Sequence, residues 1–153
     1  MNIKSLGDVM NDKTIAAVHW SFWVISSVAL IWNVLGGVNF FMQMNADLVA
    51  SLPETHRAII EGRPVWATAG FAVTVFGGAL GCLLLLLKKA AAFYLFVASL
   101  LGVIVTTIHS VDIAKSTVDF SPVEIFVMIL SPVLVAALLI WFSKWAEGKG
   151  WIN

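Results

Sequence analysis

Long uninterrupted runs of apolar residues dominate the pattern along this chain. Four runs, at residues 14–38, 64–87, 90–110 and 122–143, are long enough to cross a bilayer core as helices, which takes about 20 residues. They are continuously apolar, whereas the strands of a membrane barrel alternate between apolar and polar positions. The pattern therefore predicts an all-α integral membrane protein, folded as a single four-transmembrane-helix bundle over residues 1–153.

Capping signals mark two helix starts outside or at the ends of these runs. Ser121 and Glu124 have the three-residue spacing of a capping box. Ser51 and Glu54 repeat that spacing and predict a short interfacial helix over residues 51–61. We expect the apolar residues of this helix to rest on the membrane surface: Leu52, Ile59 and Ile60.

Two further signals concern the shape of the bundle. Lys88 and Lys89 leave so little chain between the second and third runs that these runs must form a tight antiparallel hairpin. Pro132 has no backbone N–H to donate, so it should kink the fourth helix in mid-membrane.

Composition agrees with a membrane protein and excludes several other classes. Sixty per cent of the residues are apolar, only 12% are charged, and the mean hydropathy is +0.95. Nine basic and nine acidic residues give a net charge of zero, so nothing points to nucleic acid as a partner; the lipid bilayer is the expected one. The single cysteine, Cys82, excludes an intramolecular disulfide and a CxxC pair.

Lysine and arginine are distributed unequally between the two sides of the predicted bundle. Six lie on the side of the termini and three on the side of the loops after the first and third runs. The first set is Lys4, Lys13, Lys88, Lys89, Lys144 and Lys149, and the second is Arg57, Arg63 and Lys115. The positive-inside rule then places both termini in the cytoplasm.

Small residues recur on one face of the second run at helical spacing. They include Gly70, Thr74, Gly77 and Gly81, and the last two form a GxxxG pair. Such a stripe packs helices closely, either within one bundle or between two copies, and less commonly lines a path for a solute. We expect it to support homo-oligomerisation, with packing inside the bundle as the alternative.

Polar residues at similar depth predict a vestibule on the outer side. It would consist of Asn33, Arg63, Thr106, His109 and Glu124. A histidine beside a carboxylate can titrate near neutrality and couple a proton to another event. The simpler alternatives are that Asn33 hydrogen-bonds a neighbouring helix and that Glu124 only caps its own helix.

The chain lacks the motifs of common enzymes. It has no nucleophile elbow, P-loop, dinucleotide fingerprint or metal-spaced cluster of His and Cys. His19 and His109 lie at opposite depths and cannot ligate one haem within a monomer. We therefore expect no catalytic residue, no cofactor, no metal and no enzymatic activity.

A further set of residues extends over residues 31–110. It consists of Ile31, Trp32, Asn33, Gly36, Asn39, Phe40, Gln43, Pro64, Trp66, the run Gly77-Gly78-Ala79-Leu80-Gly81, the leucines before Lys88, Ser99, Leu100 and Gly102. In these residues the chain resembles a small bacterial membrane-protein family that is commonly labelled "sugar transporter". Asn39 and Phe40 stand where the family more often has aspartate and tyrosine. The resemblance implies a multi-pass protein of the bacterial inner membrane.

Two functions are consistent with these observations. The first is a sugar or small-solute transporter that acts as an oligomer, because four short helices enclose little interior. Its ligand would be held by Trp32, Asn33, Trp66 and Thr106, with His109 and Glu124 nearby. The second is a non-enzymatic accessory or scaffold protein of a larger membrane complex.

Overall fold

The computed structural model describes residues 17–116 and 120–153, and every regular element in this part of the chain is helical. Four helices within the described residues are long and apolar enough to cross a membrane, as predicted, so the chain is a multi-pass membrane protein. The elements are α2 (Trp20–Met42), α3 (Ala46–Ala50), α4 (Glu54–Ile60), α5 (Val65–Leu86), α6 (Ala92–Ser116), α7 (Pro122–Ile125), the π-helical η1 (Phe126–Leu130) and α8 (Ser131–Gly148).

The helices are shifted from, or longer than, the predicted runs. α2 begins at Trp20 rather than at residue 14, with His19 as its N-cap; residues 14–16 lie outside the described part. It continues past residue 38 because Phe40 packs against the rings of α5. The fourth helix continues to Gly148 because its last turns keep a buried face, on which Ala146 is fully buried.

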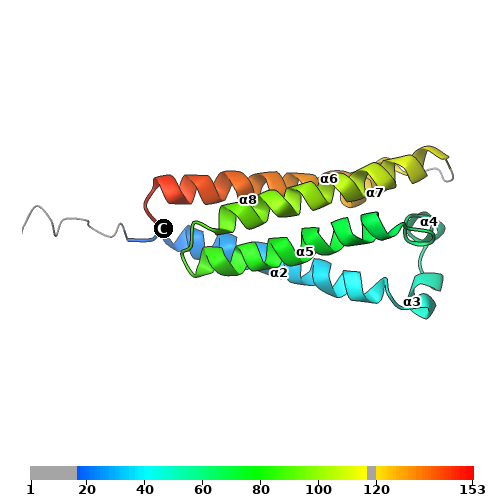
Figure 1. Cartoon of the computed structure of the whole chain (residues 1–153), viewed down its shortest axis with the longest axis horizontal. Helices are drawn as coiled ribbons and strands as arrows, with labels where there is room; N and C mark the ends of the chain where they lie inside the picture. Colours follow the sequence, from blue (N-terminus) through cyan, green and yellow to red (C-terminus); the bar gives the residue numbers. More distant parts are fainter. Residues whose placement is uncertain (1–16, 117–119) are drawn as a thin grey trace, which may run out of the picture.

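α5 and α6 form the predicted tight hairpin (Figure 1). The backbone N–H of Lys88 donates to the Leu85 carbonyl and that of Lys89 to the Leu84 carbonyl, which are the paired bonds of a Schellman motif. Lys88 takes the left-handed conformation, with φ 58°, that this motif requires. The chain therefore reverses direction within residues 87–91.

The small-residue stripe of α5 packs against α6 of the same chain. A Cβ atom on Gly70 would lie 2.7 Å from Val105, and one on Gly81 would lie 2.6 Å from Phe96. Ser99 on α6 also donates to the Thr74 carbonyl over 2.8 Å. The stripe of Gly70, Thr74, Gly77 and Gly81 is therefore packed on α6 inside the bundle, which is the alternative to a contact between copies.

α2 packs on α5 and α8 packs on α6, so the hairpin is the centre of the bundle (Figure 1). At the end where the described chain starts and stops, an apolar cluster joins all four long helices. Phe22 of α2 stacks on Phe142 of α8, with ring centroids 6.0 Å apart, and Trp151 meets Phe22 edge-on at 5.9 Å. We call this group of three rings the aromatic plug. It closes the interior at this end.

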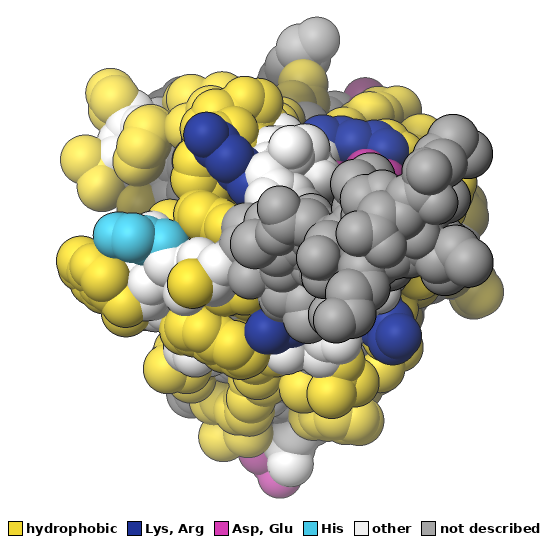
Figure 2. All heavy atoms as spheres, turned by 90° about the vertical axis from the view of Figure 1, so that its left-hand side faces the viewer, with side chains coloured by type: hydrophobic (Ala, Val, Ile, Leu, Met, Phe, Trp, Pro, Cys, Tyr) yellow, Lys and Arg dark blue, Asp and Glu magenta, His cyan; other side chains and the backbone are white. Residues whose placement is uncertain are grey.

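The same end carries a ring of lysines. Figure 2 shows Lys and Arg side chains here among apolar ones. Three lysines lie over aromatic faces: Lys88 over Trp23, Lys144 over Phe93, and Lys149 over Trp145. Both backbone groups of Asn153 also pair with the hairpin turn, at Lys88 and Ala90. The last described residues are thereby fixed to the α5–α6 connection.

The fourth helix starts as predicted and contains a π turn that was not predicted. Ser121 and Glu124 form a complete capping box. Before Pro132 the helix widens into one π turn, in which the Ser131 N–H donates to the Phe126 carbonyl five residues back. Pro132 has no backbone N–H and cannot donate the next hydrogen bond of the helix. The π turn shifts the hydrogen-bond pairing by one residue just before this position.

α3 and α4 lie at the opposite end of the bundle, with α4 across it (Figure 1). The predicted capping box at Ser51 is wrong: its hydroxyl donates to the Leu48 carbonyl of α3, and α4 starts after Pro53. Ile59 is buried, while Leu52 and Ile60 line an interior cavity. The expectation that these three residues rest on the membrane surface is therefore corrected, because they face the bundle.

Candidate functional site

A cavity of about 490 Å³ lies between the long helices at the α4 end of the bundle. α2, α5, α6, η1 and α8 form its walls, and residues 52–60 cover it. Apolar residues make up most of the lining, and a smaller set carries polar side chains. These are Asn33, Asn39, Gln43, His56, Arg63, Thr74, Ser99, Thr106, Thr107, Ser110 and Ser131. The interior of the bundle is therefore partly polar near α4 and is filled by the aromatic plug at the opposite end.

α2 and its C-cap supply the amides. The cavity is lined by Asn33 and Asn39 of α2 and by Gln43, its C-cap, together with the half-exposed Trp32. Asn33 is 8% exposed; its Nδ2 donates to the Ala29 carbonyl over 2.9 Å and lies 3.8 Å from the Cys82 sulfur. The main hydrogen bond of Asn33 is therefore within α2, and its hydrogen bond to the neighbouring α5 is the weak one to sulfur.

Arg63 brings a positive charge to the cavity. Its Nη2 donates to Oε1 of Gln43 over 2.6 Å, and its guanidinium lies 5.3 Å from the centre of the Phe71 ring. Its Nε is buried without a hydrogen-bond partner. Burial lowers the pKa of Arg63 below its usual range, but an arginine keeps its charge in proteins.

The hydroxyls of the cavity donate to backbone carbonyls. Thr74, Thr106, Ser110 and Ser131 each bond the carbonyl four residues earlier, over 2.7–3.0 Å. Each hydroxyl has used its one donor and keeps lone pairs for accepting. The cavity wall therefore offers donors from Arg63 and the amides, and acceptors from the hydroxyls.

His109 and Glu124 do not line the cavity with Asn33 and Thr106. His109 is 7% exposed, and its Nε2–H donates to the Ile59 carbonyl of α4 over 3.1 Å. Glu124 accepts from the Thr55 hydroxyl of α4 over 2.7 Å and from the Ser121 N–H over 2.9 Å. The predicted His109–Glu124 pair is wrong, because each side chain holds α4 from a different element.

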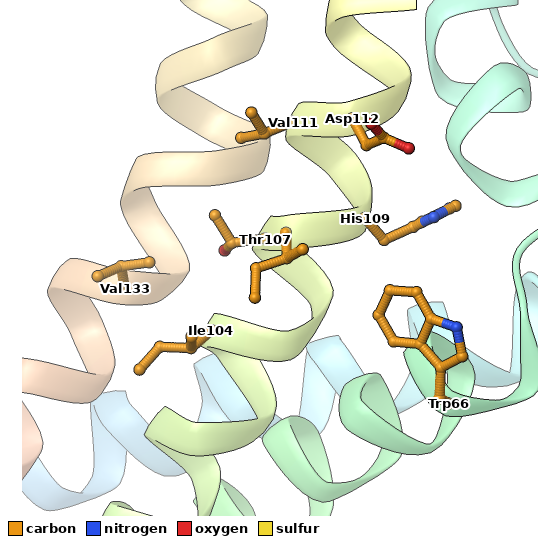
Figure 3. Close-up of a pocket in the computed structure, with 8 residues that line it drawn as sticks. Trp66, Ile104, Thr107, His109, Val111, Asp112 and Val133 are labelled. Carbon is orange, nitrogen blue, oxygen red and sulfur yellow. The ribbon is translucent and has the colours of Figure 1, made fainter.

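Trp66 lies beside His109 rather than in the cavity. Figure 3 shows the two rings pointing toward each other from α5 and α6, and their centroids are 6.0 Å apart in an edge-to-face arrangement. Both line a second, open groove, together with Asp112, apolar residues and Thr107, which also lines the cavity. Of the predicted ligand residues, Trp32, Asn33 and Thr106 thus share the cavity, whereas Trp66, His109 and Glu124 do not line it.

Sequence reasoning missed the contribution of α4. His56 lines the cavity from this helix, and its position four residues after Leu52 was a signal that the two share one face. Gln43 was noted only for the family resemblance, although it lines the cavity from the C-cap of α2. Spacing gave no signal for it, because a ten-residue interval turns it about 80° around the helix from Asn33. Thr74 was assigned to packing alone, whereas it both contacts α6 and lines the cavity.

No protein-family model, curated protein or solved structure matches the chain. Among the described residues, no group of three or more His, Cys, Asp or Glu side chains is placed to hold a metal ion. The side chains that the cavity offers to a ligand are therefore its amides, hydroxyls, aromatic rings, His56 and Arg63.

Proposed function

We propose that this protein is a non-enzymatic carrier that binds a small polar solute of the size of a sugar in the cavity and moves it across a bacterial inner membrane. The observation that carries the proposal is the cavity itself: about 490 Å³, within an apolar bundle, with amides and hydroxyls converging on it. Pockets for small ligands commonly have volumes of a few hundred Å³ and a few placed polar groups.

The residues of the cavity suit a molecule with several hydroxyl groups. Each sugar hydroxyl both donates and accepts, and the wall offers partners of both kinds, such as Asn33 and Thr106. Trp32 at the edge supplies an aromatic face on which the apolar side of a sugar ring can stack. The resemblance to a bacterial family labelled "sugar transporter" supports the same solute class.

The two ends of the bundle differ in a way that fits one step of a transport cycle. The aromatic plug closes the end with the lysines, and the cavity lies at the other end under α4. With both termini in the cytoplasm, the cavity belongs to the outer half, and transport requires Phe22 and Phe142 to separate. Ser26, fully buried one turn from Phe22, has a hydroxyl without a partner and offers a polar group on that path.

An oligomer is the expected working form, because the described part of one copy has four spans, which enclose little space around the cavity. The stripe on α5 is already covered, so a second copy would contact another surface of the bundle. The sequence-based expectation had placed the contact between copies on the small-residue stripe of α5.

The proposal is tested with purified full-length protein by thermal shift and by uptake into proteoliposomes, using a panel of neutral and acidic sugars. Asn33→Leu should abolish binding while the protein stays folded, because leucine suits the bundle but cannot hydrogen-bond a solute. Val34→Leu, at the adjacent lipid-exposed position, is the matched control and should bind normally. Wild-type protein that binds and moves no member of the panel, and instead co-purifies with a larger complex, would contradict the carrier and favour the accessory function.

A further inference from the structure

Arg63 is the most unusual charge in the described part of the chain. Arginine is seldom buried unless it is paired, because removing a charge from water is costly. Half-buried here, it has one hydrogen bond, to the neutral Gln43, and a face-on contact with Phe71. Its Nε has neither a partner nor access to solvent.

No acidic side chain neutralises Arg63 within the described residues. The ion pairs recorded there are Arg57–Glu61 on α4 and Lys144–Glu147 on α8. Glu124 is held by Thr55 and Ser121 instead. The residues that line the cavity include Arg63 and His56 but no aspartate or glutamate. Arg63 is therefore a cation without an acidic partner among the described residues that line the cavity.

The geometry around Arg63 suits an anion with two oxygens. A guanidinium presents its donors as a planar fork that matches a carboxylate or phosphate, and charge-assisted bonds of this kind are among the strongest in proteins. Gln43 accepts from Arg63 through Oε1, which leaves its amide N–H groups to donate to the same ligand. The amide of Asn39 lines the cavity on the same face of α2.

We infer that the cavity takes an anionic ligand, whose carboxylate or phosphate binds at Arg63 and Gln43 while its hydroxyl-bearing part lies toward Asn33 and Thr106. The class is a sugar acid or sugar phosphate rather than a neutral sugar. This inference rests on the proposed function and narrows its substrate. The same anionic group could also come from a lipid headgroup, since the cavity lies between membrane helices.

The test compares matched neutral and anionic ligands on the full chain in phosphatidylcholine nanodiscs. Tryptophan fluorescence and calorimetry give the affinities for galactose, galacturonate and galactose 6-phosphate. The anionic members should bind about tenfold or more tightly than galactose, as expected for one added charge-assisted contact. This comparison needs no variant and so does not depend on the folding of a mutant.

Variants of Arg63 then test whether this residue causes the preference for anionic over neutral ligands. Arg63→Gln should remove the difference between galacturonate and galactose, and Arg63→Lys should retain part of it, because lysine keeps the charge but not the fork. Arg57→Gln is the matched control: this arginine is on α4 and does not line the cavity, so the preference should stay. Equal binding of galactose and galacturonate, unchanged in Arg63→Gln, would overturn the inference and leave the proposed function standing.

A second arm separates a soluble anion from a lipid. Native mass spectrometry of protein from discs with phosphatidylglycerol should show no lipid retention that depends on Arg63. Arg63-dependent retention of phosphatidylglycerol without binding of any sugar would support the anion site and contradict the solute carrier. Absence of both sugar binding and Arg63-dependent lipid retention would overturn the inference and the proposed function together.

Discussion

At the scale of single residues, Asn33 is held in place by a glycine on the neighbouring helix. The carboxamide of Asn33 packs so closely on Gly78 that a Cβ there would overlap its oxygen. Gly78 therefore admits the amide between α2 and α5 and sets its position at the wall of the cavity.

Gly78→Ala should displace Asn33, whereas Gly77→Ala should not. At Gly77 a Cβ would make ordinary contacts, the nearest at 3.5 Å, and alanine is the better helix former. We expect Gly78→Ala to lose about 1–3 kcal/mol, the usual cost of overpacking, and to weaken solute binding. Thermal unfolding in detergent measures the first effect and fluorescence titration the second. Equal stability of the two variants would show that Asn33 is not fixed by Gly78.

Residue spacing predicted part of the site and left out the rest for a physical reason. The spacing within α2 placed Asn33 on the face toward the bundle, and the Ser121–Glu124 spacing predicted the capping box, which is confirmed. The spacing of residues along a helix predicts how deep a side chain lies in the membrane and on which face of the helix it lies. It does not predict which other helix packs against that face. His109 and Glu124 were placed at the correct end and assigned to each other, whereas both reach α4.

At the scale of elements, α4 covers the cavity and is attached by two side-chain contacts from other helices. One runs from His109 to the Ile59 carbonyl, and the other from Thr55 to Glu124. A seven-residue helix has little stability of its own, so these contacts and the burial of Ile59 decide whether it stays in place.

Thr55→Val removes the hydroxyl that donates to Glu124 while keeping the shape of the side chain. We expect the backbone amides of α4 to exchange hydrogen several-fold faster, and solute to enter and leave faster. Thr68→Val is the matched control, because the Thr68 hydroxyl bonds only the Pro64 carbonyl in its own segment. Hydrogen exchange followed by mass spectrometry gives both values, and unchanged exchange in α4 would contradict this role of Thr55.

The elements differ in how well the sequence predicted them. The hairpin was predicted correctly because Lys88 and Lys89 leave only one way for two spans to connect. The π turn before Pro132 was not, since proline predicts a lost bond but not how the helix compensates. α3 and the orientation of α4 were missed because five and seven residues carry too short a pattern to define a face.

At the scale of the whole molecule, the bundle is closed at one end and hollow at the other. Phe142 is 4% exposed within the plug, whereas Trp141 beside it is 62% exposed. Phe142→Ala should therefore open the closed end and make proteoliposomes leak the bound solute, while Trp141→Ala should leave them tight. Efflux of preloaded radiolabelled solute measures the leak, and equal efflux from both variants would argue against the plug as the barrier.

The orientation of the bundle is a separate prediction. Single cysteines are introduced at Asp47 and Lys149 in a Cys82→Ala background, and intact cells are treated with an impermeant thiol reagent. Asp47 is on α3 and Lys149 follows α8, at opposite ends of the bundle. Position 47 should label in intact cells, and position 149 only after permeabilisation, as the lysine distribution predicts. The reverse pattern would overturn the orientation.

The short α5–α6 turn has a consequence for the biosynthesis of this protein. α5 and α6 are joined by residues 87–91 and pack on each other without α2 or α8. Each helix forms its backbone hydrogen bonds internally, so the pair is stable in lipid. We therefore expect the translocon to release them into lipid as one unit, with Lys88 and Lys89 remaining on the ribosome side throughout. The hollow interior then forms last, when α8 emerges and is docked at the turn through Asn153.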